Sequence, residues 1–190
     1  MTRVDFPPVE MLSEEYRTLL ANRPPLNLYR MLPRTGALAR HFLAMGEAIR
    51  TRLSLSPSLR EIAIVRVGVR TGADYEVHHH SVLARKAGVS AASLAAAAKP
   101  DIGASPRESA LAADREGALA TDEALVIRYV DALIDTVRAD DALFAQVEAM
   151  IGTDAVAELT MVVGFYLLVS RFLTNFDIQI EGDLDHDEWV

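Results

Sequence analysis

The 190-residue chain contains no cysteine. Disulfide bonds, thiolate metal ligands and thiol-dependent catalysis are therefore excluded. Long apolar runs are also lacking. The most apolar run without a charge, LTMVVGFYLLVS at 159–170, has 12 residues, and a membrane-spanning helix needs roughly 20. We interpret this run as part of a buried helix.

Clusters of basic residues are missing as well. The net charge is −8, and the 19 Lys and Arg residues are spread along the chain. Because nucleic-acid binding depends on clustered Lys and Arg, we expect no nucleic-acid partner. The N-terminal stretch MTRVDFPPVEMLSEEY has no apolar segment of the kind found in signal peptides. We expect a soluble, cytoplasmic protein that does not associate with membranes.

Strand patterns are scarce, whereas Ala, Leu, Glu and Arg, which favour helices, are abundant. The sequence therefore predicts an all-α fold. Length and an apolar content of 51% suit one domain over residues 1–190. We divide it into an N-terminal helical extension over 1–55, a core motif over 56–100 and a C-terminal helical half over 117–190.

Capping residues, prolines and glycines indicate where the helices begin and end. Ser56 and Pro57, for example, suit the cap and first position of a helix that stops at Gly72. In the helix that follows Pro33, we expect Leu38, Phe42, Met45 and Ile49 on the inner face. A surface loop is expected at 99–109 and an exposed acidic tail at 181–190. The predicted helices run over 13–21, 26–32, 35–52, 57–71, 74–87, 90–98, 121–137, 141–151 and 154–175.

Three consecutive histidines lie in the stretch GADYEVHHHSVLARKAG. Neighbouring helical residues point about 100° apart, so the three cannot converge on one metal ion. Two of them, His78 and His79, are expected at the surface or at an interface. His80 differs because it follows Glu76 by four residues and shares a helix face with it. That face continues with apolar residues, so the pair points inward as either a structural pair or a reactive site.

Glu61 is a third polar residue in apolar surroundings. It could close a capping box with Ser58, or it could lie inside a helix that begins at Pro57. In the second case a buried carboxylate needs a partner, and the next helix could supply His80. A carboxylate hydrogen-bonded to an imidazole fixes its tautomer and raises its basicity.

The stretch LREIAIVRVGVRTGADYEVHHHSVLARKAGVS resembles the core of the carboxymuconolactone decarboxylase family, which includes the alkyl hydroperoxidase D-like proteins. The family signature is a glutamate at the start of an apolar helix, a glycine-containing turn, and a second helix with a histidine. Glu61 and His80 match it. The peroxidase branch has Cys-x-x-Cys at the positions of Ala73 and Glu76, so both thiols are absent here. The decarboxylase branch commonly has a glutamate at the position of the second cysteine, and Glu76 matches it.

The resemblance implies an all-α, alkyl hydroperoxidase D-like helical bundle with an N-terminal helical extension. It implies a homo-oligomer whose site lies near the subunit contacts. The implied activity is a carboxy-lyase reaction on a small unsaturated lactone or carboxylic acid, without a cofactor. His80 would donate the proton, with Glu61 and Glu76 setting its orientation and charge.

The expected substrate-binding residues are Arg66, Arg70 and Tyr75. The two arginines lie four residues apart on one face, and guanidinium suits a carboxylate. That face could equally be a solvated surface. Two other readings of the protein stay open: a non-catalytic oligomeric helical protein that kept the fold, and a divalent-metal site formed by Glu61, Glu76 and His80.

Overall fold

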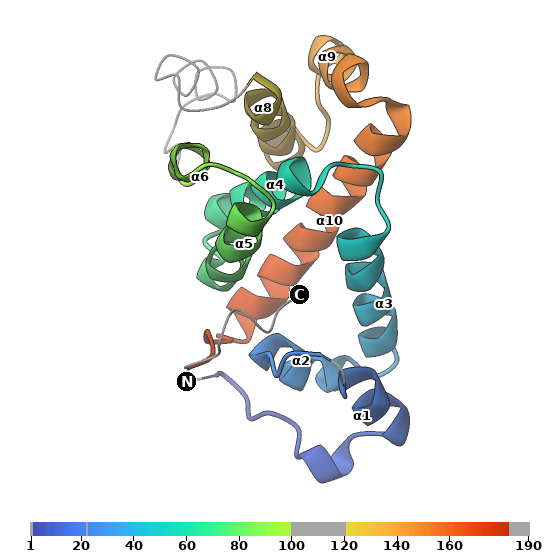
Figure 1. Ribbon diagram of the computed structural model, residues 1–190. Helices are drawn as coiled ribbons and strands as arrows, with labels where there is room; N and C mark the ends of the chain where they lie inside the picture. The colour runs from blue at the N-terminus through green and yellow to red at the C-terminus, as the bar shows by residue number, and fades with distance from the viewer. Residues whose placement is uncertain (1, 22, 100–120, 183–190) are drawn as a thin grey trace. The chain divides into compact units, whose positions relative to one another are not determined.

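The structure, a computed structural model, describes residues 2–21, 23–99 and 121–182. Within these residues the chain forms α-helices and two 3-10 helices, and no strand (Figure 1). The predicted all-α fold is confirmed. The chain divides into two compact units, a terminal unit of Met1–Arg52 with Leu173–Val190 and a central unit of Leu53–Phe172. The predicted division into one domain with three parts stays a prediction.

The terminal unit holds mostly short helices, and the first α-helix is capped as the sequence indicates. Ser13 accepts a hydrogen bond from the backbone N–H of Tyr16 at 3.1 Å and starts the first α-helix. The chain does not leave its helical path at Pro33, because proline is tolerated in the first turn of the 3-10 helix that follows. The elements are η1 (Val9–Met11), α1 (Glu14–Leu20), α2 (Asn27–Met31), η2 (Leu32–Thr35) and α3 (Leu38–Thr51).

The predicted inner face of α3 is partly wrong. Leu38 was expected inside, but 69% of its surface is exposed. The prediction was based on large apolar side chains alone, whereas close packing of a helix also favours small ones. The buried face is displaced by about one residue and consists of Ala39, Leu43, Gly46 and Ile49.

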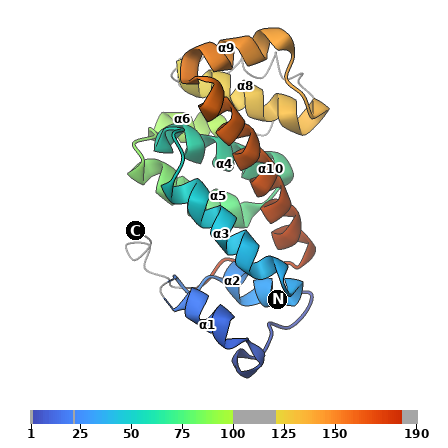
Figure 2. The same ribbon diagram turned by 90° about the vertical axis from the view of Figure 1, so that its right-hand side faces the viewer.

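The central unit is built around α4 (Pro57–Thr71), which packs against α5 (Asp74–Lys86) and α8 (Thr121–Thr136). Ser56 caps α4, and Gly72 ends it in the left-handed conformation at φ 65°, both as the sequence predicts. α6 (Ala91–Ala97) also contacts α4. α8 runs beside α9 (Asp141–Ile151), as Figure 2 shows. Thr153–Asn175 form α10, whose last three residues belong to the terminal unit.

α10 is long and apolar enough to cross a membrane, judged by length and composition alone. Half of its most apolar 18-residue window is buried within the protein. Val162, Val163 and Val169 are among its buried residues. A buried core helix passes the same test of length and composition, and α10 has a buried side of this kind.

Most of the predicted loop at 99–109 and of the tail at 181–190 lies outside the described residues.

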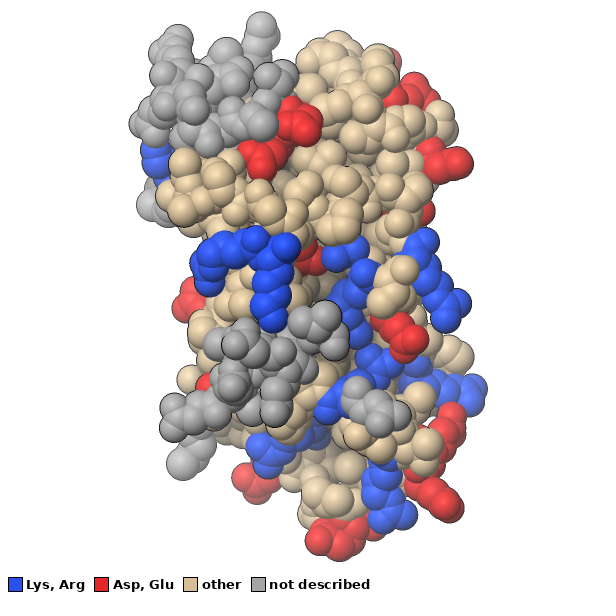
Figure 3. Space-filling model, viewed as in Figure 1, with Lys and Arg blue, Asp and Glu red and all other residues tan. Residues whose placement is uncertain are grey.

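Acidic side chains occur among the basic ones on the face of the molecule in Figure 3. This face therefore does not carry one sign of charge, which agrees with the scattered arginines of the sequence.

Candidate active site

Glu61 lies inside α4, in the most deeply buried helix of the central unit. Ser56 is the N-cap and Pro57 the first residue of α4, so the capping box at Ser58 is not formed. Every residue from Glu61 to Gly68 is buried, and Glu61 itself is only 1% exposed. A carboxylate in this position needs a partner, since an unpaired buried charge costs several kcal/mol.

A glycine lets α5 approach α4 closely. An added Cβ at Gly68 would lie 3.0 Å from Cγ2 of Val77, 3.2 Å from its backbone N and 3.3 Å from Cβ of Glu76. These separations are too short for ordinary van der Waals contact. Gly68 therefore sets the distance between the two helices that carry the candidate site.

His80 is the partner of Glu61. Its Nδ1 atom lies 2.7 Å from Oε2 of Glu61, in a buried hydrogen bond between α5 and α4. Its Nε2 atom lies 3.3 Å from Oε2 of Glu76, one helical turn earlier on α5. The predicted meeting of Glu61 and His80 across two adjacent helices is confirmed. Glu76 and His80 also share the inward face that the sequence predicts, and both are buried.

Arg60 completes a row of alternating charges. Its Nε atom donates to Oε1 of Glu61 at 2.9 Å, so each oxygen of this carboxylate has a cationic partner. The order Arg60, Glu61, His80, Glu76 alternates positive and negative when His80 is protonated. We call these four residues the charge row. Its formal charge is then zero, which suits a group of ions withdrawn from water.

Two opposing effects act on the pKa of His80. Burial lowers it, because the charged imidazolium loses water. The charge and hydrogen bond of Glu61, followed by those of Glu76, act in the opposite direction and raise the pKa from 6.5 to about 9. For Glu61, burial raises the pKa, but the charges and hydrogen bonds of His80 and Arg60 outweigh it and lower the pKa. At neutral pH the pair is thus an imidazolium and a carboxylate.

Tyr166 of α10 packs against the imidazole. The two rings meet edge to face with their centroids 4.9 Å apart. Phe165 lies next to Tyr166 at 5.5 Å in the same geometry. Tyr166 and Arg60 are not predicted from the sequence. Tyr166 is remote in sequence, and Arg60 immediately precedes Glu61, a spacing at which helical side chains are not expected to meet.

Arg66 and Arg70 lie away from the Glu61–His80 pair. Arg66 follows Glu61 by five positions on α4, which places them on different faces. Arg66 is 1% exposed and holds both oxygens of Asp131 at 2.8 Å. It also donates to the backbone carbonyls of Ala97 and Lys99 at 3.1 and 2.8 Å.

Arg70 binds the same cluster. It contacts Asp131 at 2.7 Å and Asp135 at 2.6 Å. The predicted role of Arg66 and Arg70 in holding a substrate carboxylate is therefore not supported, because α8 supplies carboxylates to both guanidinium groups. They tie α4 to α8 instead.

The other residues of the histidine stretch form a separate ring cluster. The rings of Tyr75 and His79 lie 4.4 Å apart, and those of His78 and His79 lie 5.0 Å apart. His79 is 4% exposed, so its expected position at the surface or an interface is wrong. The i, i+4 spacing of Tyr75 and His79 explains the burial, because the tyrosine ring covers the imidazole. Tyr75 thus faces this cluster, next to the Glu76–His80 face.

The geometry does not favour a metal ion held jointly by Glu61, Glu76 and His80. The two carboxylates lie at opposite nitrogens of one imidazole. A metal ion bound to either nitrogen would therefore have only one of the two carboxylates beside it. Among the described residues, no group of three or more His, Asp or Glu side chains is arranged to bind a metal ion.

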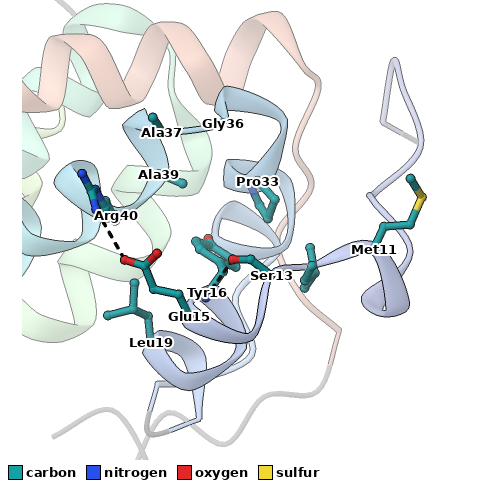
Figure 4. Close-up of a pocket in the computed structure, with 11 residues that line it drawn as sticks. Met11, Ser13, Glu15, Tyr16, Leu19, Pro33, Gly36, Ala37, Ala39 and Arg40 are labelled. Atoms are coloured by element: carbon teal, nitrogen blue, oxygen red, sulfur yellow. Dashed lines mark hydrogen bonds and ion pairs between the residues drawn. The ribbon is translucent and has the colours of Figure 1, made fainter.

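A pocket of about 480 Å³ lies elsewhere, in the terminal unit (Figure 4). Arg40 and Glu15 form an ion pair of 3.7 Å at its edge. None of the charge-row residues lines it. The lining consists of Met11, Leu12, Ser13, Glu15, Tyr16, Leu19, Pro33, Gly36, Ala37, Ala39 and Arg40.

Part of the chain matches a known protein family, and its fold matches a solved structure. Residues 36–116 match the Carboxymuconolactone decarboxylase family. In structure, the chain is similar to an uncharacterized peroxidase-related protein with an alkylhydroperoxidase AhpD core from Ralstonia eutropha JMP134. That likeness covers 95% of this chain and 92% of the other, with a TM-score of 0.74 and 16% sequence identity. No curated protein matches the chain.

At this identity the structural likeness shows the fold, which is the alkyl hydroperoxidase D-like helical fold that the sequence predicts. The family match contains α4 and α5 with Glu61, Glu76 and His80. The match to the carboxymuconolactone decarboxylase family extends over 81 of the 190 residues.

Proposed function

We propose that the charge row is the proton-transfer site of a carboxy-lyase that acts on a small unsaturated lactone or carboxylic acid. The observation that carries the proposal is the buried 2.7 Å hydrogen bond between Glu61 and His80. It supports an imidazolium that is present at neutral pH and held in one orientation. Such a group can serve as a general acid.

The reaction breaks the bond between the substrate carboxylate and its carbon, and CO2 leaves. The electron pair moves into the conjugated carbonyl group of the substrate and forms a dienolate. His80 then gives a proton to the dienolate carbon, which restores a neutral product. The Nε2 atom is the donor, because its 3.3 Å contact with Glu76 is longer than the 2.7 Å hydrogen bond that joins Nδ1 to Glu61. No cofactor is needed for this step, since the substrate accepts the electrons itself.

Proton transfer changes the charge of the row. Once His80 is neutral, the two carboxylates and Arg60 leave a net charge of −1. This excess negative charge favours the return of a proton to His80, which resets the acid for the next turnover. Glu61 and Glu76 therefore act by setting the charge of the imidazole, and Glu61 also fixes its orientation.

The substrate also has to be held. Arg60 is the arginine of α4 that reaches the pair, and its side chain is 12% exposed. We assign the carboxylate of the substrate to Arg60 in place of Arg66 and Arg70. The ring of Tyr166 supplies an apolar wall beside the imidazole. This combination favours a flat, unsaturated acid over a polar sugar or a nucleic acid, and we place the reaction in the cytoplasm.

Peroxide reduction through a thiol is not part of the proposal. The chain has no cysteine, and Ala73 and Glu76 occupy the two positions where the peroxidase branch has its thiols. Glu76 instead lies 3.3 Å from Nε2 of His80. Addition of a hydroperoxide with a dithiol reductant should therefore give no turnover above that of a heat-treated sample.

The test is a panel of unsaturated lactones and β-keto acids, assayed for CO2 release and for double-bond movement. On any substrate that is turned over, His80→Gln should lower kcat by a factor of about 10² to 10⁴, since it removes the proton but keeps a similar size. His78→Gln is the matched control and should keep full activity.

Full turnover by a folded His80→Gln protein would show that His80 does not carry the proton. A His80→Gln protein that fails to fold, together with a wild-type protein that is inactive on the whole panel, would favour a structural pair in a non-catalytic protein.

A further inference from the structure

One face of α10 is exposed although it carries no charge in its middle. Met161 and Leu168 are 58% and 53% exposed. Gly164, which lies between them, and Ala157, one turn before Met161, are exposed as well. In contrast, the exposed positions of α5 and α8 include charged residues such as Asp74, Lys86 and Asp122. An outward helix face of this composition needs an explanation.

The spacing of these residues is that of a helix–helix seam. Ala157, Met161, Gly164 and Leu168 follow each other at intervals of four, three and four residues, and the next interval of three leads to Arg171. These intervals repeat every seven residues and define a narrow stripe. We call these five residues the α10 stripe. A lipid surface suits a wider apolar face flanked by basic residues, whereas a narrow seam suits a second helix.

Gly164 strengthens this argument. A glycine inside a helix costs about 1 kcal/mol relative to alanine. The described residues give no steric reason for it, because an added Cβ would meet none of their atoms within 4 Å. At Gly68, by comparison, the neighbouring helix leaves no room for a Cβ. A helix that packs on the outside of Gly164 would account for the glycine in the same way.

We propose that the α10 stripe pairs with the stripe of a second copy of this chain, in antiparallel orientation about Gly164. Charge selects both the partner and the direction. Asp154 is exposed in the first turn of α10 and Arg171 near the other end of the stripe. A parallel pair would put each Arg171 beside the partner's Arg171.

An antiparallel pair instead brings Arg171 toward the N-terminal end of the partner's helix, where the partner's Asp154 and the positive end of the helix dipole lie. The opposite carboxylate stabilises the guanidinium, and the two helix dipoles also align favourably. In this arrangement Met161 packs against the partner's Leu168, and the two Gly164 residues meet at the two-fold axis. The proposal is independent of the proposed reaction.

The absence of cysteine allows a direct test of the pairing. Met161→Cys and Leu168→Cys are prepared as two separate variants, each with a single thiol. When they are mixed and mildly oxidised, a disulfide-linked dimer should form between the two variants, because these positions face each other. Either variant alone should cross-link much less. In an antiparallel pair the same residue of the two copies is displaced by about 9 to 12 Å along the helix axis, which is too far for a disulfide.

Efficient cross-linking within each single variant would overturn the antiparallel arrangement. No cross-linking in any sample would overturn the proposed interface.

Light scattering at micromolar concentration supplies the second readout. The wild-type protein should have at least twice the 20.8 kDa mass of one chain, and Leu168→Glu should lower that mass by half or more. Val137→Glu is the control, because Val137 is an exposed apolar residue outside the stripe, at 85% exposure. It should leave the mass unchanged.

If Leu168→Glu does not fold, Gly164→Ala tests the same interface with a minimal change. In the paired arrangement it should weaken association at least tenfold, although it favours the helix itself. A monomeric wild-type protein would overturn the proposal. So would wild-type protein that binds neutral lipid vesicles through the stripe, or an oligomer that neither variant affects.

Discussion

Nδ1 of His80 lies 2.7 Å from Oε2 of Glu61, a residue 19 positions earlier on a different helix. The side chain of Glu61 is 1% exposed and that of His80 10% exposed. With so little water to screen them, the two groups determine each other's protonation. Changes to one should therefore be measurable at the other.

Glu61→Gln should lower the pKa of His80 from about 9 toward its ordinary value of 6.5. The glutamine keeps the shape of the side chain but removes the negative charge that favours the imidazolium. NMR titration of the histidine ring protons measures this shift, and the signal of His80 is identified by its loss in His80→Gln. An unchanged pKa would show that Glu61 does not set the charge of His80.

Glu158→Gln is the matched control for this titration. Glu158 is also a carboxylate near the start of a helix, but it accepts hydrogen bonds from Ser54 and Leu55 and does not contact His80 in the structure. Its replacement should leave the pKa of His80 unaltered.

The Glu61–His80 pair also makes stability depend on pH. His80 has a higher pKa in the folded protein than in the unfolded chain, so its contribution is complete below pH 6.5 and is lost as the pH rises through about 9. Glu61 has a lower pKa when folded, so its contribution is present above its unfolded value of 4.5 and is lost as the pH falls through the folded value. Both contributions are complete between about pH 4.5 and 6.5.

Urea unfolding at a series of pH values between 6.5 and 9.5 measures the loss of the His80 contribution. The free energy of unfolding should fall by up to about 3 kcal/mol between pH 6.5 and 9.5, since one unit of pKa corresponds to about 1.4 kcal/mol. In His80→Gln this decline should be largely absent. An equally steep decline in that variant would assign the pH dependence to other groups.

The sequence predicted the helices well where local chemistry determines their ends. Ser13, Ser56 and Ser90 cap helices through their own side chains, and Gly72 ends α4 with a positive φ. Each of these signals acts over a few residues and can therefore be read directly. The Glu61–His80 contact was also accessible, because the i, i+4 relation to Glu76 fixed the inward face of α5.

The remaining parts of the site depend on contacts between distant segments. Arg66 and Arg70 looked suited to a substrate carboxylate, and nothing near them in sequence shows that Asp131 of α8 binds both. Tyr166 reaches His80 from α10, and no local pattern distinguishes it from any other aromatic residue in an apolar helix. Such pairings follow from helix packing and not from sequence spacing.

The cluster of Arg66 and Asp131 should be essential for stability. Arg66→Ala would leave the carboxylate of Asp131, which is 1% exposed, with one arginine instead of two. Breaking a buried pair typically costs about 3 to 5 kcal/mol, because a buried charge loses its compensation. Arg70→Ala should cost less, since Arg70 is more exposed and the bidentate contact of Arg66 remains.

Urea unfolding of the two variants at pH 6 provides the comparison. The proposed ordering is wrong if Arg70→Ala loses as much stability as Arg66→Ala. The pKa of His80 should change in neither variant that folds, because the cluster lies on a different face of α4 from Glu61.

Gly68→Ala tests whether close helix packing brings the charge row together. The new methyl group would lie 3.0 Å from Cγ2 of Val77, which can rotate away, and 3.2 Å from the backbone N of Val77, which cannot. α5 therefore has to move, and with it Glu76 and His80. Although alanine favours a helix over glycine by about 1 kcal/mol, overpacking typically costs about 1 to 3 kcal/mol. We expect a net loss of stability.

The movement of α5 should also lengthen the hydrogen bond between His80 and Glu61. We therefore expect a lower pKa of His80 in Gly68→Ala together with the lower free energy of unfolding. Gly164→Ala is the control, studied at a concentration low enough to dissociate any dimer. Its added Cβ meets no atom of residues 2–21, 23–99 and 121–182 within 4 Å, so it reports helix propensity alone and should raise stability slightly. If Gly68→Ala behaves like this control in both measurements, the approach of α5 to α4 does not depend on the glycine, and the charge row is held by its own ion pairs.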